Sequence, residues 1–285
     1  MTTDWRERLA ALDDDERIDT HTHSTCSDGT DSPSEIVCKA VEAGLAGVAI
    51  SDHDTMAGYR MAAVNGVPKR FVLLPATELT AYYGEHEIHV LGYGFDAEDE
   101  ALCSFLDTCS RYRRERAIKI IRNLREKAGI ELEFEHMAAK HGKFPLGRPH
   151  IAYELVENGV CKNTYEAFHK YLHDGSPYME QKYKVSVPEA VRVIHEAGGR
   201  AVLAHPGMLS KQVQVTVLLT LGLDGIETGH PRHHITYERA MNRYSRKREI
   251  PTTGGSDYHG AHRRDVEVGN RTTTAKQLRQ LLSAG

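Results

Sequence analysis

The stretch that decides the fold is Arg17-Ile-Asp-Thr-His-Thr-His-Ser-Thr-Cys-Ser-Asp28-Gly-Thr. Asp19, His21 and His23 are spaced by two, so a β-strand through them would project all three side chains from one face. The run offers almost no apolar side chain for packing. Two imidazoles on one strand face, followed by the Asp28 carboxylate, are typical of half a metal-binding shell. A lone His-x-His pair occurs in an exposed polar loop as often as in a metal site. The choice between these two interpretations therefore depends on the rest of the chain.

Potential metal ligands recur where the expected strands end. Strands are expected at 17–19, 46–51, 71–78, 85–93, 200–205, 224–230 and 250–256. The residues at or just after these ends are His21, His23, His53, Glu78, His205, His230, Asp257 and His259. Parallel strands of an α/β barrel direct their carboxyl ends to one face, where active sites lie. Residues from both ends of the chain are therefore expected to meet in one site.

Strand and helix patterns alternate over residues 1–96 and 186–285, and we expect these two ranges to form one metal-binding β/α unit. Capping boxes at Ser32–Glu35 and Ser186–Glu189 predict the start of two of its helices. Residues 97–185 instead carry one helical pattern after another, with no convincing buried strand. We interpret this range as a helical insertion that forms a lid over the active site.

The composition is that of a globular protein of one large domain. The 285 residues are 40% hydrophobic and 27% charged, with a formal net charge of −4, so no basic field favours nucleic acid or a membrane surface. The five cysteines are an odd count without a Cys-x-x-Cys pair, which favours reduced thiols. No signal segment or membrane span is evident, and a cytoplasmic location is expected.

Six motifs in this order resemble those of the PHP (polymerase and histidinol phosphatase) family, within the amidohydrolase-like group. They are Asp19-x-His21-x-His23, Ser27-Asp28-Gly29, Ser51-Asp52-His53-Asp54, Glu78, Ala204-His205-Pro206 and Ser256-Asp257-Tyr-His259. The middle of the chain is similar to the helical insertion of the nucleotidase-like branch. The resemblance implies a distorted seven-stranded, TIM-like β/α barrel with two or three divalent metals at its carboxyl face.

The resemblance also implies which residues hold each metal. The first metal would be held by His21, His23, Glu78 and Asp257. Glu78 would bridge to a second metal held by His205 and His89, although His86 competes with His89 for that role. The third would be held by Asp28, His53 and His259.

The donor set suits this assignment chemically. Imidazoles and carboxylates without a thiolate favour transition metals, with manganese first and iron(II) or zinc as alternatives. Bound cations make a bridging hydroxide available near neutral pH and neutralise phosphate oxygens. Asp19, Asp52 and Asp54 are expected either to orient imidazoles or to make plain structural hydrogen bonds.

A phosphate on these metals needs a further cationic contact. Arg148 is the predicted substrate-binding and catalytic residue. It lies in a Gly147-Arg-Pro-His150 segment that is similar to one in the nucleotidase-like relatives. The alternative is that Arg148 is a solvent-exposed arginine without a role in the site. Lys182 and Lys184 are weaker candidates for a second phosphate. His230 could protonate the leaving oxygen or contact the phosphate, or merely cap its strand.

We therefore expect a hydrolase of small phosphate esters, a nucleotide or sugar phosphate, either monoester or cyclic diester, that acts through metal-bridged hydroxide. The alternatives are an exonuclease of short oligonucleotides, a histidinol-phosphate-type phosphatase, a non-catalytic regulatory module, and a metal-dependent deaminase or amidase. Basic residues of the 98–128 helix surround an apolar stripe, which favours a solvated face over a binding site for long nucleic acid. The sequence names no protein partner.

Overall fold

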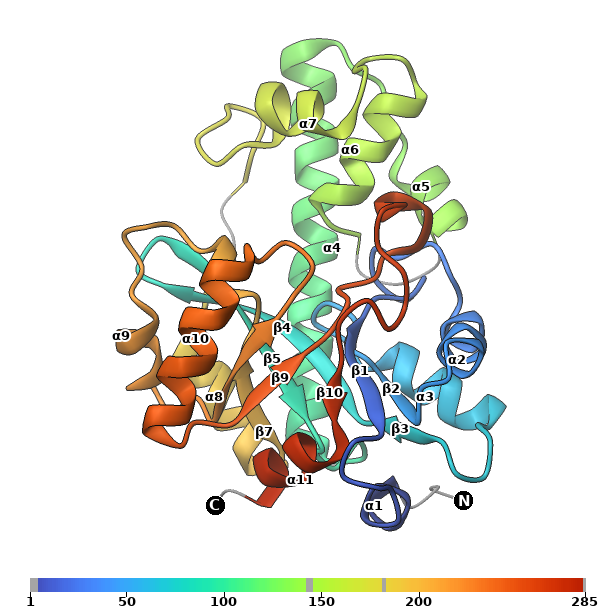
Figure 1. Ribbon diagram of the computed structural model, residues 1–285. Coiled ribbons are helices and arrows are strands. Elements are labelled where there is room, and N and C mark those ends of the chain that lie inside the picture. Colours follow the sequence, from blue (N-terminus) through green and yellow to red (C-terminus); the bar gives the residue numbers. More distant parts are fainter. Residues whose placement is uncertain (1–4, 142–145, 181–182, 284–285) are drawn as a thin grey trace.

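The computed structural model describes residues 5–141, 146–180 and 183–283, and its strands form two mixed sheets (Figure 1). One sheet has the strand order β10-β1-β2-β3 and the other the order β6-β4-β5-β7-β8-β9. The strands are β1 Arg17–Thr22, β2 Gly47–Ile50, β3 Val72–Leu74, β4 Ala76–Tyr83, β5 His86–Tyr93, β6 Val185–Ser186, β7 Arg200–Leu203, β8 Gly225–Gly229, β9 Thr252–Gly254 and β10 Thr273–Thr274.

The two sheets meet at two seams without closing into one hydrogen-bonded barrel. At one seam, the backbone after β9 pairs with β1, where Asp257 N–H donates to the His21 carbonyl at 2.8 Å. At the other, the strand expected at 71–78 divides at Pro75, and its two halves, β3 and β4, belong to different sheets. Proline has no N–H to continue a ladder. A mixed α/β fold is observed, and a closed seven-stranded barrel is not confirmed.

Strand direction also differs from an all-parallel arrangement. β5 runs antiparallel to both β4 and β7, whereas β7, β8 and β9 are parallel to one another. A ligand on β5 therefore cannot reach the site from the carboxyl end of its strand, as the ligands after β1, β2, β7 and β9 do. His89 reaches it from the middle of β5, opposite Thr80 of β4.

Several of the helices pack against the two sheets. The helices are α1 Trp5–Ala10, α2 Pro33–Glu42, α3 Ala57–Asn65, α4 Glu100–Ala128, α5 Phe134–His141, α6 Arg148–Glu157, α7 Thr164–Ala167, α8 Val187–Glu196, α9 Val215–Leu219, α10 Ile235–Arg248 and α11 Ala275–Ser283. Ser32 begins α2 with a complete capping box. At α8, Ser186 accepts from Glu189 N–H as expected. No described helix is both long and apolar enough to cross a membrane.

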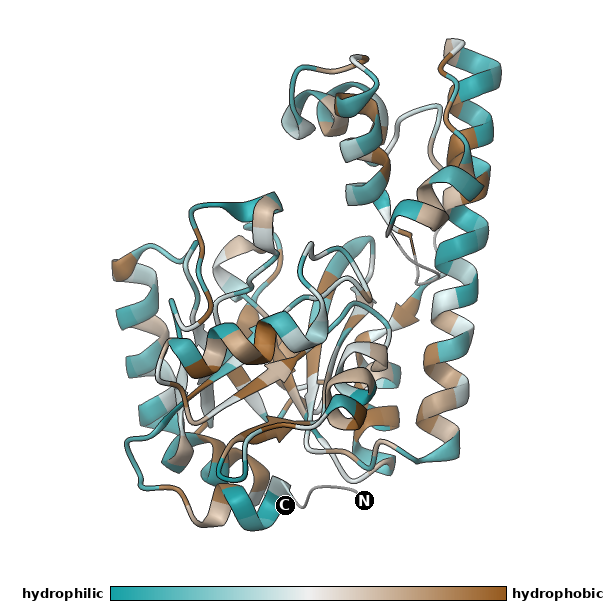
Figure 2. Cartoon of the chain, turned by 90° about the vertical axis from the view of Figure 1, so that its right-hand side faces the viewer, coloured by the Kyte–Doolittle hydropathy of each residue, from teal (hydrophilic) through white to brown (hydrophobic). Residues whose placement is uncertain are grey.

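The helices α4 to α7, with the π-helical turn Phe168–Leu172 that follows them, form what we call the helical segment. Figure 2 shows α4 rising along the side of the two-sheet body and continuing beyond it to carry the smaller helices. Leu102 and Leu106 near the start of α4 pack in the core of the body, together with α8. Leu124 near its end packs in a separate apolar cluster with Leu155 of α6. One helix thus belongs to two hydrophobic cores.

Candidate metal centre

The carboxylate of Glu78, the third residue of β4, lies at the centre of the site and is 1% exposed. Five imidazole nitrogens lie within 3.5 Å of it. Its Oε1 is 2.9 Å from His89 Nδ1 and 3.0 Å from His205 Nε2. Its Oε2 is 3.0 Å from His53 Nδ1, 3.3 Å from His23 Nε2 and 3.5 Å from His21 Nε2. One oxygen faces two rings and the other faces three, which is the arrangement a bridging carboxylate requires.

The strand geometry distinguishes the two histidines of β5. Side chains alternate between the faces of a strand, so His86 and His89, three positions apart, point to opposite faces. His89 faces Glu78, whereas His86 pairs with Tyr83 at the tip of the β4–β5 hairpin. The structure therefore brings His89 to the cluster.

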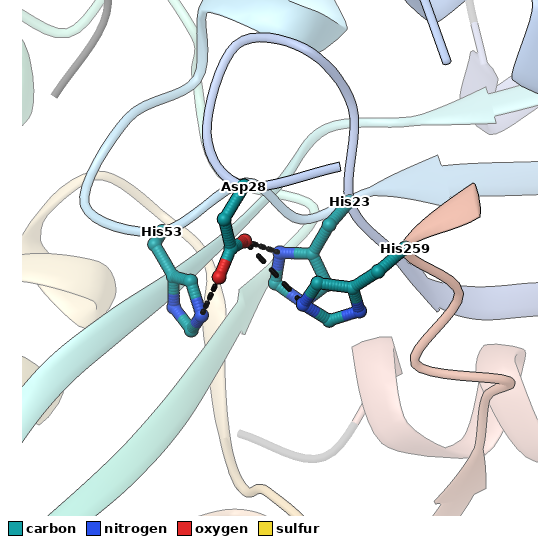
Figure 3. Close-up of side chains that lie close together, drawn as sticks. All are labelled: His23, Asp28, His53 and His259. Carbon is teal, nitrogen blue, oxygen red and sulfur yellow. Dashed lines mark ion pairs between the residues drawn. The ribbon is translucent and has the colours of Figure 1, made fainter. Parts of the chain in front are cut away.

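A second group surrounds Asp28 on the loop after β1 (Figure 3). Asp28 Oδ1 lies 3.3 Å from His259 Nε2 and 3.8 Å from His23 Nδ1, and Oδ2 lies 3.8 Å from His53 Nε2. Although Asp28 Oδ1 and His53 Nδ1 lie close to other polar atoms, both are buried and neither makes a hydrogen bond of acceptable geometry. Buried polar atoms left in this way call for an ion or water.

Asp257 approaches His23 at the ring nitrogen opposite the one that faces Asp28, and it also lies close to His21. Its Oδ1 is 3.3 Å from His23 Nε2 and 3.5 Å from His21 Nε2. Its Oδ2 faces away from these rings, toward His230 Nε2 at 3.1 Å and the guanidinium of Arg263. One oxygen is thus directed at the metal-binding rings while the other is held by neighbouring cationic or proton-donating groups.

Glu227 of β8 was not predicted as a site residue. It is fully buried and accepts a hydrogen bond from His21 Nδ1 at 2.9 Å, and its second oxygen accepts from His205 N–H at 2.7 Å. It therefore fixes which nitrogen of His21 faces Glu78. The available signal was a carboxylate inside the strand expected at 224–230, in Gly225-Ile-Glu-Thr-Gly229.

The three other carboxylates near the histidines make structural hydrogen bonds rather than orienting imidazole rings. Asp19 accepts from the backbone N–H of His21, Ser256 and Gly269. Asp52 accepts from the backbone and hydroxyl of Ser24 and from the Ser27 hydroxyl, which shapes the loop that carries Asp28. Asp54 accepts from Thr80 N–H and from Arg113 of α4. Of the two expectations for these residues, the structural one describes them.

The charges of the cluster favour bound cations. Burial lowers the pKa of His21, yet the carboxylates of Glu227, Glu78 and Asp257 raise it well above its usual value. The same competition raises the pKa of His23 to about 9 and that of His89 to about 10. The carboxylates thus draw positive charge onto buried rings, and divalent ions would meet the same demand.

The donor set also fits metals by geometry. His21 Nε2 and His23 Nε2 lie 3.1 Å apart, close to the roughly 3.4 Å expected between two ligand atoms about 2.1 Å from one tetrahedral ion. Three overlapping groups have ligand atoms within 4.8 Å of one another: His21, His23 and Glu78; His23, Asp28, His53 and His259; and His53, Glu78 and His89. The residues present are therefore able to bind metal.

The helical segment touches the loops that carry two of the ligands. His150 of α6 donates from Nε2 to the Ser27 carbonyl at 2.8 Å. Tyr153, one turn further along α6, stacks on His262, with ring centroids 3.5 Å apart. His262 in turn donates to the Asp28 carbonyl at 3.0 Å. The end of α6 nearest the site is thus attached to the backbone around Asp28 and His259.

A cavity of about 160 Å³ lies between the cluster and the helical segment. Asp28, His53 and His89 line it, and so do Arg113 and Arg116 of α4 and Arg148 of α6. Arg148 is not in solvent: its guanidinium donates to both oxygens of Glu87 at 3.1 and 3.2 Å and to Asp174 at 3.2 Å. Lys184 pairs with Glu85, and Lys182 lies outside the described residues.

Comparison with known proteins agrees with this geometry. A family model described as the PHP domain matches residues 19–211. The chain is 31% identical over 248 residues to a 5′-3′ exoribonuclease of Haemophilus influenzae, covering 85% of this chain and 90% of the relative. It is 31% identical over 259 residues to the 3′,5′-nucleoside bisphosphate phosphatase of Chromobacterium violaceum, covering 89% and 90%.

A third relative and one solved structure extend the comparison. The chain is 31% identical over 258 residues to the phosphoribosyl 1,2-cyclic phosphate 1,2-diphosphodiesterase of Eggerthella lenta, covering 89% of this chain and 98% of the relative. A candidate metal-dependent phosphoesterase from Bifidobacterium adolescentis superposes with a TM-score of 0.82 at 30% identity, over 94% of this chain and 96% of that one.

Replacement of Glu78 by glutamine should reduce metal content more than any neighbouring change. The unmodified chain is expected to bind two to three divalent ions after growth with manganese, and Glu78→Gln removes the charge that two ions would share. Elemental analysis of both proteins measures the difference. Glu126→Gln, an exposed change on α4, is the matched control. Equal metal content in wild type and Glu78→Gln would contradict the bridging role.

Replacement of Glu227 by glutamine should weaken metal binding without unfolding the chain. Glutamine can accept one of the two hydrogen bonds that Glu227 accepts, but its amide nitrogen then opposes the other N–H. A fall of about 10- to 100-fold in metal affinity is expected, measured by competition with a chelator. Circular dichroism checks the fold. Unchanged affinity would show that His21 needs no such partner.

Proposed function

The chain belongs to the PHP domain family, and we propose that it is a metal-dependent phosphoesterase that hydrolyses small phosphate esters, among them nucleotides or sugar phosphates. The observation that carries the proposal is a cavity bounded on one side by the imidazole–carboxylate cluster and on another by three arginines. Divalent ions on one wall and guanidinium groups on the other suit a phosphorylated molecule rather than an amide or amine.

The assignment of individual ligands rests on the distances above. We propose that His21, His23, Glu78 and Asp257 would hold one ion, that Glu78, His89 and His205 would hold a second, and that Asp28, His53 and His259 would hold a third. Contacts of 3.0–3.5 Å within each group support this proposal. We propose manganese as the resident ion, with iron or zinc as alternatives. When bound, the ions supply positive charge against the phosphate oxygens and make water acidic enough to react near neutral pH.

The chain's own residues would bind and orient the ester. Arg148 would donate to the phosphate oxygens, exchanging part of its contact with Glu87 for the substrate. His230 is better suited to holding Asp257 than to protonating a leaving group, because Nδ1 accepts from Arg232 N–H and Nε2 faces Asp257. Residues 97–185 would serve as a lid over residues 1–96 and 186–285, because α6 lies against the loops of the site.

A phosphate-release screen tests the proposed function. The manganese-loaded protein should release phosphate from nucleoside monophosphates, 3′,5′-bisphosphates or sugar phosphates, and activity should vanish with a chelator and return with metal. Cyclic phosphates and short oligoribonucleotides belong in the same screen, because relatives named for a cyclic phosphate and for RNA are equally similar. Phosphorus NMR would show whether a cyclic ester is opened. A protein that binds metal but hydrolyses none of these would be a regulatory module instead.

Replacement of Arg148 by alanine should preserve metal content and impair catalysis. If the guanidinium contacts the phosphate and this contact strengthens in the transition state, kcat/KM should fall by an equivalent of roughly 2–4 kcal/mol. Arg122→Ala, an exposed arginine of the same segment, is the control. If Arg148→Ala has wild-type kinetics, Arg148 does not contact the substrate. Its role would then be to attach α6 to β5 through its ion pair with Glu87.

A further inference from the structure

His233, three residues after His230, is a buried imidazole to which the proposed function assigns no role. Its Nδ1 lies 2.9 Å from the Thr228 carbonyl oxygen, and its Nε2 lies 3.0 Å from the backbone nitrogen of Gly207. A carbonyl can only accept a hydrogen bond and a backbone N–H can only donate one. The neutral ring therefore donates from Nδ1 and accepts at Nε2.

This pairing excludes two other roles that a histidine beside a metal centre could have. A metal ligand needs a free nitrogen lone pair, and a general acid needs a proton that can reach the substrate. In His233 the Nε2 lone pair accepts from Gly207 N–H, and the Nδ1 proton is directed at a backbone carbonyl. Among the described residues, His233 is accordingly in none of the groups whose ligand atoms lie within 4.8 Å of one another.

The hydrogen bond to Gly207 holds the turn that follows His205. The 3-10 turn Pro206–Met208 begins directly after His205, whose φ of 29° is rare for a residue with a side chain. Two hydrogen bonds hold the backbone on either side of this strained conformation. His205 N–H donates to Glu227 at 2.7 Å, and Gly207 N–H donates to His233. Both acceptors belong to β8 and the turn after it, although none of the proposed ligands lies there.

The packing around Gly207 confines the His233 ring. A Cβ built on Gly207 would lie 2.6 Å from His233 Cδ2 and 3.1 Å from Tyr237 Cδ1, so a larger residue would force the ring or the turn to shift. The other neighbour of the ring is Tyr237 of α10, which packs against it in a T-shaped arrangement with centroids 5.2 Å apart. The imidazole thus lies between the turn after β7 and α10.

We propose that His233 is a positioning residue that, by accepting from Gly207 N–H, keeps the His205 ring directed at Glu78 and so sets the affinity of the second metal position. This inference rests on the proposed function, because it assumes that His205 holds an ion there. His205 Nε2 lies 3.0 Å from Glu78 Oε1. Without the bond to Gly207, the His205 backbone would relax toward an ordinary φ and move the ring away from that oxygen.

His233→Gln and His233→Asn separate the two hydrogen bonds of the ring. Glutamine can place Oε1 where Nε2 accepts from Gly207, whereas asparagine can place Nδ2 where Nδ1 donates to Thr228. Chelator competition on the manganese-loaded full chain should show one ion bound about 10- to 100-fold more weakly in His233→Asn, with a much smaller loss in His233→Gln. The two metal-free variants should melt alike, which excludes a general loss of stability. His234→Asn is the control, because asparagine can also cap α10.

Gly207→Ala tests the same contact from the other side. It should weaken the same ion in the wild-type background and add little in the His233→Ala background, where the partner is already lost. Nitrogen-15 NMR of the metal-free protein should show His233 protonated at Nδ1 and not at Nε2. Additive effects of Gly207→Ala and His233→Ala, or the opposite tautomer, would contradict the inference.

Metal affinity and activity together separate this inference from the proposed function. If no ester is hydrolysed but the affinity of one ion falls from wild type to His233→Gln to His233→Asn, the positioning role stands although the proposed activity fails. If esters are hydrolysed and both variants bind metal as tightly as wild type, the activity stands and the inference is overturned. Equal losses in the two variants would also overturn it, because the bond to Gly207 would then not be the decisive one.

Discussion

The site depends on one buried negative charge, the carboxylate of Glu78, with five imidazoles around it. A carboxylate removed from water costs several kcal/mol unless other groups compensate it. Here the compensating rings come from β1, from the turn after β2, from β5 and from the turn after β7. The order of the strands therefore matters because it brings these rings to one carboxylate, and the two-sheet arrangement can be understood as the means of doing so.

Backbone strain is concentrated at the same place. Of the four described non-glycine residues with positive φ, three are at the site: Asp54 at 53°, His205 at 29° and Asp257 at 51°. Such conformations cost about 1–3 kcal/mol each and persist where surrounding contacts determine them. Asp54 is held by Thr80 and Arg113, and the His205 N–H is held by Glu227. The carboxylates around the histidines thus stabilise strained backbone as well as providing charge.

Much of this could be predicted because the strand-end pattern is local. The spacing of His21 and His23, the capping box at Ser32 and the helical ranges follow from periods of two and 3.6 residues. The division of a strand at Pro75 into two sheets could not be predicted, because it depends on which neighbours the halves find. The partners of Glu227 depend likewise on residues far away in the sequence. His89 could be distinguished from His86 only once the pairing of β5 with β4 was known, because that pairing decides which face of β5 is turned to Glu78.

The attachment of α6 to the body has a consequence for how such a protein can change during evolution. His150 donates a hydrogen bond to the Ser27 carbonyl, and Tyr153 stacks on His262, which donates to the Asp28 carbonyl. The helical segment is therefore in direct contact with the loop that carries Asp28. A different segment could not simply be exchanged into residues 97–185 to alter specificity. It would have to reproduce these contacts, or the body would need compensating mutations beside its own ligands. Sequence change in residues 97–185 is thereby coupled to the loop that carries the predicted metal ligand Asp28.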